Sequence, residues 1–338
     1  MKTLQAGVVR IAAACALVAA AWSPVVHAEV GEVKLARQFG LAHLPLIVME
    51  DKKLIEAASA KLGAPAKAVF HQLASTGGIN EALLAGQLDF APNGAPSLLT
   101  IWDKTRGTSN EVRGLVAVNE FTFYLNTNRA GLKSIRDLTD QDRIVVSAVK
   151  VSVPAIMLQI AAQKEWGKDQ WSRLDKLTVS MSHPDGMAAL LSRREVTAHF
   201  TSPPFMQQEL EKPGITRVTT SDEIMGGPTV GTILFGTGKF VSANPKVSQA
   251  VFDAAVEAVD FINNNKRAAA ELYIRVAKDK SSVEEIQRQI SDGTLNFNVT
   301  PRNAMVFARF MNSVGSIKNA PASWRDMFFP VAYKLQGS

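Results

Sequence analysis

Cysteine is almost absent from this sequence. Its 338 residues include a single cysteine, Cys15, which lies in the N-terminal stretch. The rest of the chain therefore has no disulfide framework, no cysteine nucleophile and no thiolate metal site. A chain without free thiols suits an oxidising compartment. Lipid attachment to Cys15 is not expected, because only four apolar residues separate it from Arg10.

A hydrophobic run long enough to span a bilayer, which takes about 20 apolar residues, is also missing. The run at 11–21 has eleven residues, follows Lys2 and Arg10, and precedes a short stretch of small residues that ends at Ala28. This order is typical of a secretory signal peptide. We expect residues 1–28 to be removed, which leaves a mature chain of 310 residues.

Basic clusters and the common catalytic motifs are missing as well. The net charge of +6 falls to +4 once Lys2 and Arg10 leave with the signal peptide, and aromatic residues make up only 7%. We therefore expect no nucleic-acid partner and a mild preference for anions. The sequence has no G-x-S-x-G, no P-loop, no H-E-x-x-H and no G-x-G-x-x-G after the first predicted strand. We expect no catalytic residues, no cofactor and no metal.

An internal repeat is present instead. "STGGINEALLAGQLDFAPNGAPSLL" (75–99) and "HPDGMAALLSRREVTAHFTSPPF" (183–205) both read as a turn, a helix with a Leu-Leu pair, a short strand and a polar loop with proline. The matching landmarks are Pro45 and Pro154, 109 residues apart, Leu83 and Leu190, 107 apart, and Pro96 and Pro204, 108 apart. The alternative is that any two β-α-β units look alike.

The repeat predicts two α/β lobes of one plan, about 33–120 and 142–230. Because strands alternate with helices, each lobe should have a mostly parallel sheet flanked by helices, with a ligand cleft between the lobes at the strand ends. We read the extended stretches 121–128 and 231–238 as the crossings, and the helical region 240–338 as packing back on lobe one. The predicted division is lobe one at 29–122 plus 232–338 and lobe two at 123–231.

Three segments carry a resemblance to a known family. They are "GINEALLAGQLDFAPNGAPSLL", "LKSIRDLTDQDRIVVSAVKVSVPAIMLQ" and "PDGMAALLSRREVTAHFTSPPF". The chain resembles periplasmic solute-binding proteins of ABC importers, of the nitrate/sulfonate/taurine (NitT/TauT) type. The resemblance implies a type II periplasmic-binding-protein fold in a monomer that closes on a small-molecule solute in the periplasm and docks on an ABC permease in the inner membrane.

The solute class follows from the same segments. The resemblance implies that "AVKVSVP" contacts the anionic head of a solute, and here Val151 and Val153 replace small residues. We expect a small organic anion, a sulfonate or a carboxylate, and an aromatic one fits Phe39, Phe121 and Phe200 near the loops. The alternatives are a pyrimidine thiamine precursor, bound by proteins of the same family, and a lyase of small aromatic acids on a related fold.

Strand-end loops and helix starts supply the candidate ligand-binding residues. In "HFTSPPF", Thr201 and Ser202 stand before two prolines that hold the loop rigid, so their hydroxyls can meet a ligand or cap the next helix. Arg37 lies in an apolar strand and needs a partner, either the ligand or a carboxylate. The full set is Arg37, Gln38, His43, Thr76, Gly77, Asn93, Gly94, Asn119, Lys150, Ser152, Thr201 and Ser202. His183 is read as part of a turn.

Overall fold

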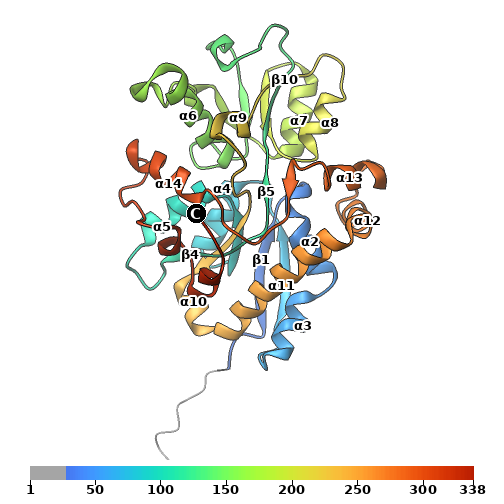
Figure 1. Ribbon diagram of the computed structural model, residues 1–338, viewed down its shortest axis with the longest axis vertical. Helices are drawn as coiled ribbons and strands as arrows, with labels where there is room; N and C mark the ends of the chain where they lie inside the picture. Colours follow the sequence, from blue (N-terminus) through green and yellow to red (C-terminus); the bar gives the residue numbers. More distant parts are fainter. Residues whose placement is uncertain (1–27) are drawn as a thin grey trace, which may run out of the picture.

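The computed structural model describes residues 28–338, and within them two sheets of five strands define two lobes (Figure 1). The predicted signal peptide, apart from its last residue, lies outside the described residues. No helix within residues 28–338 is long and apolar enough to cross a membrane. Lobe one is the lower half of Figure 1 and lobe two the upper half.

The sheet of lobe one has the strand order β2-β1-β3-β11-β4. Its strands are β1 (Glu32–Arg37), β2 (Lys67–Gln72), β3 (Phe90–Asn93), β4 (Val112–Ala117) and β11 (Ile233–Thr237). β1 pairs in parallel with β2 and β3, and β11 pairs antiparallel with β3 and β4. Four strands therefore run the same way and β11 runs against them.

The sheet of lobe two has the order β10-β6-β9-β7-β8. Its strands are β6 (Tyr124–Thr127), β7 (Ile144–Val146), β8 (Thr178–Ser180), β9 (Ala198–Thr201) and β10 (Thr216–Thr220). β7 pairs in parallel with β8 and β9, whereas β6 pairs antiparallel with β9 and β10. Read from β8, this sheet repeats the order and directions of lobe one, so the predicted mostly parallel, repeated α/β plan is confirmed.

The odd strand of each sheet enters directly after the chain changes lobes. β6 follows the first crossing and β11 follows the second, and each inserts between strands of the new lobe. Our reading of 121–128 and 231–238 as crossings was wrong for most of their length, because the backbone groups of both stretches find partners inside a sheet. The crossings are the shorter segments ahead of these strands.

Helices flank both sheets. In lobe one they are η2 (Leu41–His43), α2 (Leu44–Asp51), α3 (Leu54–Lys61), α4 (Thr76–Leu84), α5 (Ala95–Thr105), α10 (Gly238–Ala243), α11 (Pro245–Asn264), α12 (Lys266–Ala277), α13 (Val283–Gln289), α14 (Ala304–Ser313), η6 (Trp324–Met327) and η7 (Pro330–Lys334). In lobe two they are η3 (Ile135–Asp137), α6 (Val153–Trp166), η4 (Lys168–Gln170), η5 (Asp175–Leu177), α7 (His183–Ser192), α8 (Phe205–Leu210) and α9 (Ser221–Met225).

Proline sets several helix starts, since its fixed φ suits the first turn and its missing N–H is no loss there. Pro45 and Pro154, the matching landmarks of the repeat, stand in the first turns of α2 and α6, and Pro245 opens α11. α14 begins at Ala304, directly after Asn303, which adopts a left-handed φ of 56°.

A small ribbon joins the two crossings. β5 (Glu120–Phe121) pairs with β12 (Leu295–Asn296), and Glu120 also bridges to Val230 of the second crossing. Figure 1 shows β5 in the middle of the molecule, between the lobes. The two lobes therefore meet at a junction that includes the C-terminal part of the chain.

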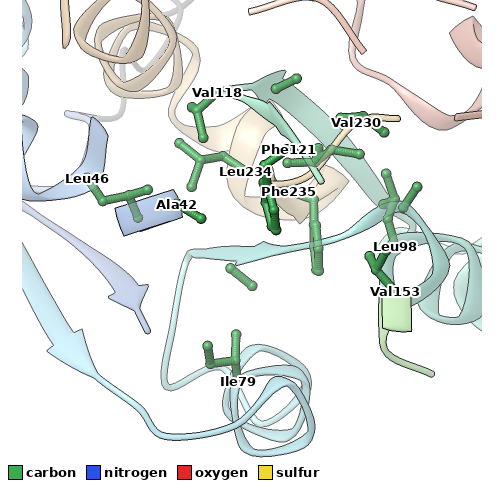
Figure 2. Packing of buried hydrophobic residues seen from close by; sticks show 14 of the residues in the cluster. Ala42, Leu46, Ile79, Leu98, Val118, Phe121, Val153, Val230, Leu234 and Phe235 are labelled. Atoms are coloured by element: carbon green, nitrogen blue, oxygen red, sulfur yellow. The ribbon is translucent and has the colours of Figure 1, made fainter. Parts of the chain in front are cut away.

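An apolar contact between the lobes lies beside this junction. Val153, which opens α6 of lobe two, lies next to Leu98 of α5 in lobe one (Figure 2). Both side chains are buried. The contact brings the N-terminal end of α6 against lobe one, where polar residues of both lobes meet.

Candidate functional site

A cavity of about 50 Å³ lies between the lobes. The lobes contact each other around it: the Leu41 N–H donates to Pro203 O at 3.0 Å, and Thr76 Oγ1 donates to Ser147 Oγ at 3.4 Å. The polar residues that border the cavity are Gln38, His43, Thr76 and Asn93 from lobe one, Ser147, Ser152, His183 and Ser202 from lobe two, and Thr232 from the second crossing. Both lobes thus build one site.

Lobe one supplies a wall of amides and hydroxyls. Asn93, at the end of β3, donates from Nδ2 to Asn80 Oδ1 at 2.9 Å and to Thr76 O at 3.3 Å. Its Oδ1 accepts from Gln38 Nε2 at 2.7 Å. These bonds fix the orientation of the Asn93 amide, because each of its two ends has a defined partner.

Lobe two supplies imidazoles backed by a carboxylate. His183 Nδ1 lies 3.1 Å from His199 Nε2 and 3.2 Å from Thr201 Oγ1. His199 Nδ1 lies 2.6 Å from Glu209 Oε1, and Glu209 Oε2 accepts from Asn126 Nδ2 at 2.9 Å. His199, Thr201 and Glu209 are fully buried, whereas His183 borders the cavity.

A third imidazole, His43, borders the cavity from lobe one. Burial and, to a smaller extent, the charge of Arg37 lower the pKa of His43 to about 3, so this ring is neutral near pH 7. Its Nδ1 is buried and has no hydrogen-bond partner among the described residues. An unpartnered buried nitrogen is costly unless a solvent or solute group meets it.

Four helices begin at the cavity. Thr76 and His183 are the first residues of α4 and α7, and Gly94 and Ser152 precede α5 and α6. Free backbone N–H groups and the positive ends of helix dipoles favour an anion at such a place. No lysine, arginine, aspartate or glutamate of residues 28–338 borders the cavity. The arrangement suits a small anion held by N–H and O–H groups rather than by an ion pair.

The aromatic residues divide between cavity and core. Phe39, Phe121 and Phe123 border the cavity, and the rings of Phe121 and Phe123 lie 4.6 Å apart. Phe200 is fully buried and packs edge-on against Phe123 at 6.0 Å. An apolar part of a solute can therefore meet Phe39, Phe121 and Phe123, but not Phe200.

Seven of the twelve predicted residues border the cavity: Gln38, His43, Thr76, Asn93, Gly94, Ser152 and Ser202. Gly94 also permits the lobes to approach, since a Cβ there would lie 2.1 Å from Val153 Cγ2. Ser152 donates from Oγ to Ala148 O at 2.5 Å, so its hydroxyl is already engaged.

The other five predicted residues lie away from the cavity lining. Arg37 pairs with Glu50 at 3.0 Å and donates to Gln72, and it faces an outer groove of about 800 Å³ instead. Lys150 is exposed, with a left-handed φ of 64°. Gly77 is the second residue of α4. The outer groove is larger, but it lacks the converging helix starts, so we place the site in the inner cavity.

The remaining two predicted residues act behind the lining. Asn119 donates to Ala42 O at 2.5 Å and accepts from Thr232 N–H at 2.8 Å, so its amide links η2 to the segment that precedes β11. Thr201 contacts His183 from the end of β9. Thr201 and Ser202 do not cap the next helix, because α8 begins after Pro204 without a side-chain cap.

Sequence reasoning missed Ser147, His183 and Thr232. His183 was read as part of a turn, but Ser182 caps α7 and His183 is its first residue. The repeat contained the signal: the offset of 107 that aligns Leu83 with Leu190 also aligns Thr76 with His183. Ser147 follows β7 and Thr232 precedes β11, and neither residue lies in a distinguishing motif.

Comparison with known proteins agrees with this architecture. The model of the NMT1-like family matches residues 27–277, more than half of the chain. No curated protein sequence matches the chain. A protein of Bordetella bronchiseptica RB50 has a similar structure, with a TM-score of 0.70 and 19% identity over 89% of this chain and 95% of its own.

Two further similar structures have stated ligands. The alkanesulfonate-binding protein SsuA of Xanthomonas axonopodis pv. citri, bound to MOPS, has a TM-score of 0.67 and 15% identity over 92% of this chain and 100% of its own. The nitrate-binding protein NrtA of Synechocystis PCC 6803 has a TM-score of 0.67 and 17% identity over 91% of this chain and 86% of its own. These are periplasmic binding proteins of the type that the sequence motifs resemble, and at such identities they show the two-lobed fold. The match over residues 27–277 shows that this chain belongs to the NMT1-like family.

Proposed function

We propose that this protein is the solute-binding component of an ABC importer and captures a small organic anion, a sulfonate or a carboxylate, between its lobes. The observation that carries the proposal is the convergence of four helix starts, two from each lobe, on one cavity that no charged side chain of residues 28–338 borders. Oriented N–H and O–H groups replace part of the hydration shell of an anion. The sulfonate- and nitrate-binding structural neighbours support the same class.

Closure of the lobes would complete the site. We propose the division 29–122 plus 232–338 and 123–231, with rotation about the crossings near β5. A monomer of this kind would bind its solute in the periplasm, after removal of residues 1–28, and deliver it to a membrane permease. The proposed contacts are the seven predicted residues that border the cavity together with Ser147, His183 and Thr232.

A pyrimidine is the second candidate. The amides of Gln38 and Asn93 and the imidazoles of His43 and His183 offer both donors and acceptors, as a heteroaromatic ring with exocyclic groups requires. Phe121 and Phe123 offer an apolar face to such a ring. A pyrimidine is uncharged, however, and makes no use of the helix dipoles.

A solute screen separates these candidates. Aliphatic and aromatic sulfonates, carboxylates and aminopyrimidines would be ranked by the rise in melting temperature, because a ligand bound only by the native state raises stability. Calorimetric titration would then confirm stoichiometry. We expect one anion to bind at one site per chain; stabilisation by an aminopyrimidine alone would favour the second candidate, and turnover of any compound would contradict a binding protein.

A further inference from the structure

The hydrogen-bond chain Glu209–His199–His183 reaches from the interior of lobe two to the cavity. Three of its four ring nitrogens have partners: His199 Nδ1 meets Glu209, and His199 Nε2 meets His183 Nδ1. The fourth, His183 Nε2, has no partner among the described residues. Because His183 borders the cavity, Nε2 is the ring nitrogen left for a solute.

The buried carboxylate of Glu209 is the reason why the Glu209–His199–His183 hydrogen-bond chain needs one additional proton. Glu209 and His199 are fully buried, and the neighbours of the carboxylate are His199 and the uncharged amide of Asn126. No lysine or arginine of residues 28–338 pairs with Glu209. An isolated buried carboxylate is strongly unfavourable, whereas a proton shared between Glu209 and His199 neutralises the pair.

That proton dictates the tautomer of His183. Whether it resides on Glu209 or on His199 Nδ1, the Nε2 of His199 carries a hydrogen and donates it to His183 Nδ1. His183 Nδ1 is then an acceptor, so the hydrogen of the neutral ring must be on Nε2. The Thr201 hydroxyl, 3.2 Å from the same Nδ1, can donate in the same sense.

Without that proton, the hydrogen bonds between His183, His199 and Glu209 would reverse direction. His199 would donate from Nδ1 to the Glu209 carboxylate and accept at Nε2 from His183 Nδ1–H. The cavity would then meet a lone pair at His183 Nε2, which repels an anion. In both arrangements His183 stays neutral, in agreement with burial and the nearby His199 and His43, which lower its pKa well below the ordinary value.

We propose that His183 is the hydrogen-bond donor that lobe two contributes to an anionic solute, and that the proton shared by Glu209 and His199 holds it in the Nε2–H tautomer. This inference rests on the proposed function. The groups that act on His183 are His199 of β9, Glu209 of α8 behind it, and His43 of η2; Asp185 of its own helix accepts from Ser182 Oγ at 2.5 Å. Loss of the shared proton would remove the donor, because the hydrogen bonds from His183 to Glu209 would then reverse direction.

Nitrogen-15 NMR of the solute-free protein tests the tautomer directly. The histidines in residues 28–338 are His43, His71, His183 and His199, so the variants His43→Gln, His71→Gln and His183→Gln, each of which lacks one signal, allow assignment. We expect His183 to carry its hydrogen on Nε2 and not on Nδ1 near pH 6.5. A His183 ring protonated at Nδ1 alone would overturn the proposal, whatever the solute.

Glu209→Gln provides a sharp second test. The glutamine can donate from Nε2 to His199 Nδ1 and accept at Oε1 from Asn126, which reproduces the protonated arrangement without a titratable carboxylate. Methanesulfonate, acetate and benzoate, which remain anionic from pH 6 to 9.5, would be titrated calorimetrically. At pH 6.5 we expect Glu209→Gln to retain the affinity of the wild type, because its amide donor preserves the Nε2–H tautomer of His183. A loss of affinity in Glu209→Gln would contradict the proposed role of the shared proton.

Variants at His183 complete the test. His183→Leu removes the donor and should weaken binding at pH 6.5 by roughly tenfold or more, whereas His183→Gln, which offers an amide N–H near the position of Nε2, should retain more of it. His71→Gln should bind as the wild type. Wild-type affinity in His183→Leu would overturn the contact. Failure of the wild type to bind any of the three anions would contradict the proposed anion class and the contact, while the NMR tautomer would still test the Glu209–His199 mechanism separately.

Discussion

The two lobes share one backbone plan but place different chemistry at equivalent positions. Thr76 and His183 begin α4 and α7, 107 residues apart, and Asn93 and Thr201 end β3 and β9, 108 residues apart. In lobe one these positions belong to a network of amides and hydroxyls. In lobe two they join a buried chain of two imidazoles and a carboxylate.

The two lobes therefore share the geometry of the site but differ in whether their side chains can exchange protons. The fold brings a helix start and a strand end to the same place in both lobes, so each lobe can face a solute. The amide wall cannot change its charge between pH 5 and 9, whereas the imidazole wall can rearrange its hydrogens. The walls are therefore expected to respond differently to substitution and to pH.

The largest effect is expected where the two walls meet. In Gly94→Ala the new Cβ would overlap Val153 Cγ2, since the two positions are 2.1 Å apart, and α6 could not approach lobe one as it does here. Overpacking of this kind costs about 1–3 kcal/mol, so solute affinity should fall roughly 5- to 150-fold. Calorimetric titration measures this loss.

A compensating substitution provides the control for Gly94. Adding Val153→Ala removes the overlapping methyl group, so the double variant should recover part of the affinity. Gly31→Ala, where no atom lies within 4 Å of a new Cβ, should behave as the wild type. Equal affinity of Gly94→Ala and the wild type would mean that the lobes need not make this contact to hold the solute.

An effect of intermediate size is expected on the free energy of unfolding at acid pH. Because the pKa of His43 is about 3 in the folded chain, against an ordinary value near 6.5, the unfolded chain binds the proton first. Stability therefore begins to fall below pH 6.5 and continues to fall until about pH 3. From His43 alone the loss at pH 5 should be about 2 kcal/mol.

Urea unfolding at pH 7 and pH 5 measures this loss. In His43→Gln the difference between the two pH values should be smaller than in the wild type, even if the variant is less stable at both. In His71→Gln, at an exposed position of β2, the difference should not change. An unaltered pH difference in His43→Gln would contradict a neutral buried imidazole on the lobe-one wall.

The smallest effects separate two neighbours in "HFTSPPF". Ser202 borders the cavity, whereas Thr201 is fully buried behind His183. Ser202→Ala should weaken solute binding by roughly two- to tenfold, the value of one hydrogen bond, and leave the melting temperature of the solute-free protein nearly unchanged. Thr201→Val should lower that stability by about 1 kcal/mol. If Thr201→Val lost affinity and Ser202→Ala lost stability instead, the roles assigned to the two hydroxyls would be wrong.

How much of this could be predicted from sequence follows from the kind of signal. Local patterns were sufficient for the repeated α/β plan, with the landmarks Pro45 and Pro154 in the first turns of two helices. Long-range pairing was not predictable: β6 and β11 look like any extended stretch, and only the tertiary fold inserts them into opposite sheets.

The site shows the same limit at the level of single residues. Strand-end position correctly indicated that Asn93 and Ser202 lie at the cavity, because the carboxyl ends of parallel strands meet there. Arg37 follows the same rule by sequence but pairs with Glu50 on the outer side of the sheet, a partner thirteen residues away that no local pattern identifies. His183 was hidden because a Pro-Asp-Gly sequence can open a helix as well as form a turn.

The distance between the lobes in solution tests the central claim most directly. The mature chain is expected to lack cysteine, so Lys104→Cys on α5 and Lys168→Cys on η4, both at exposed positions, would carry the only two spin labels. Pulsed electron paramagnetic resonance would record their separation with and without the tightest-binding anion of the screen. The account predicts a shorter and narrower distance distribution when the anion is bound; an unchanged distribution at saturation would contradict capture by closure of the two lobes.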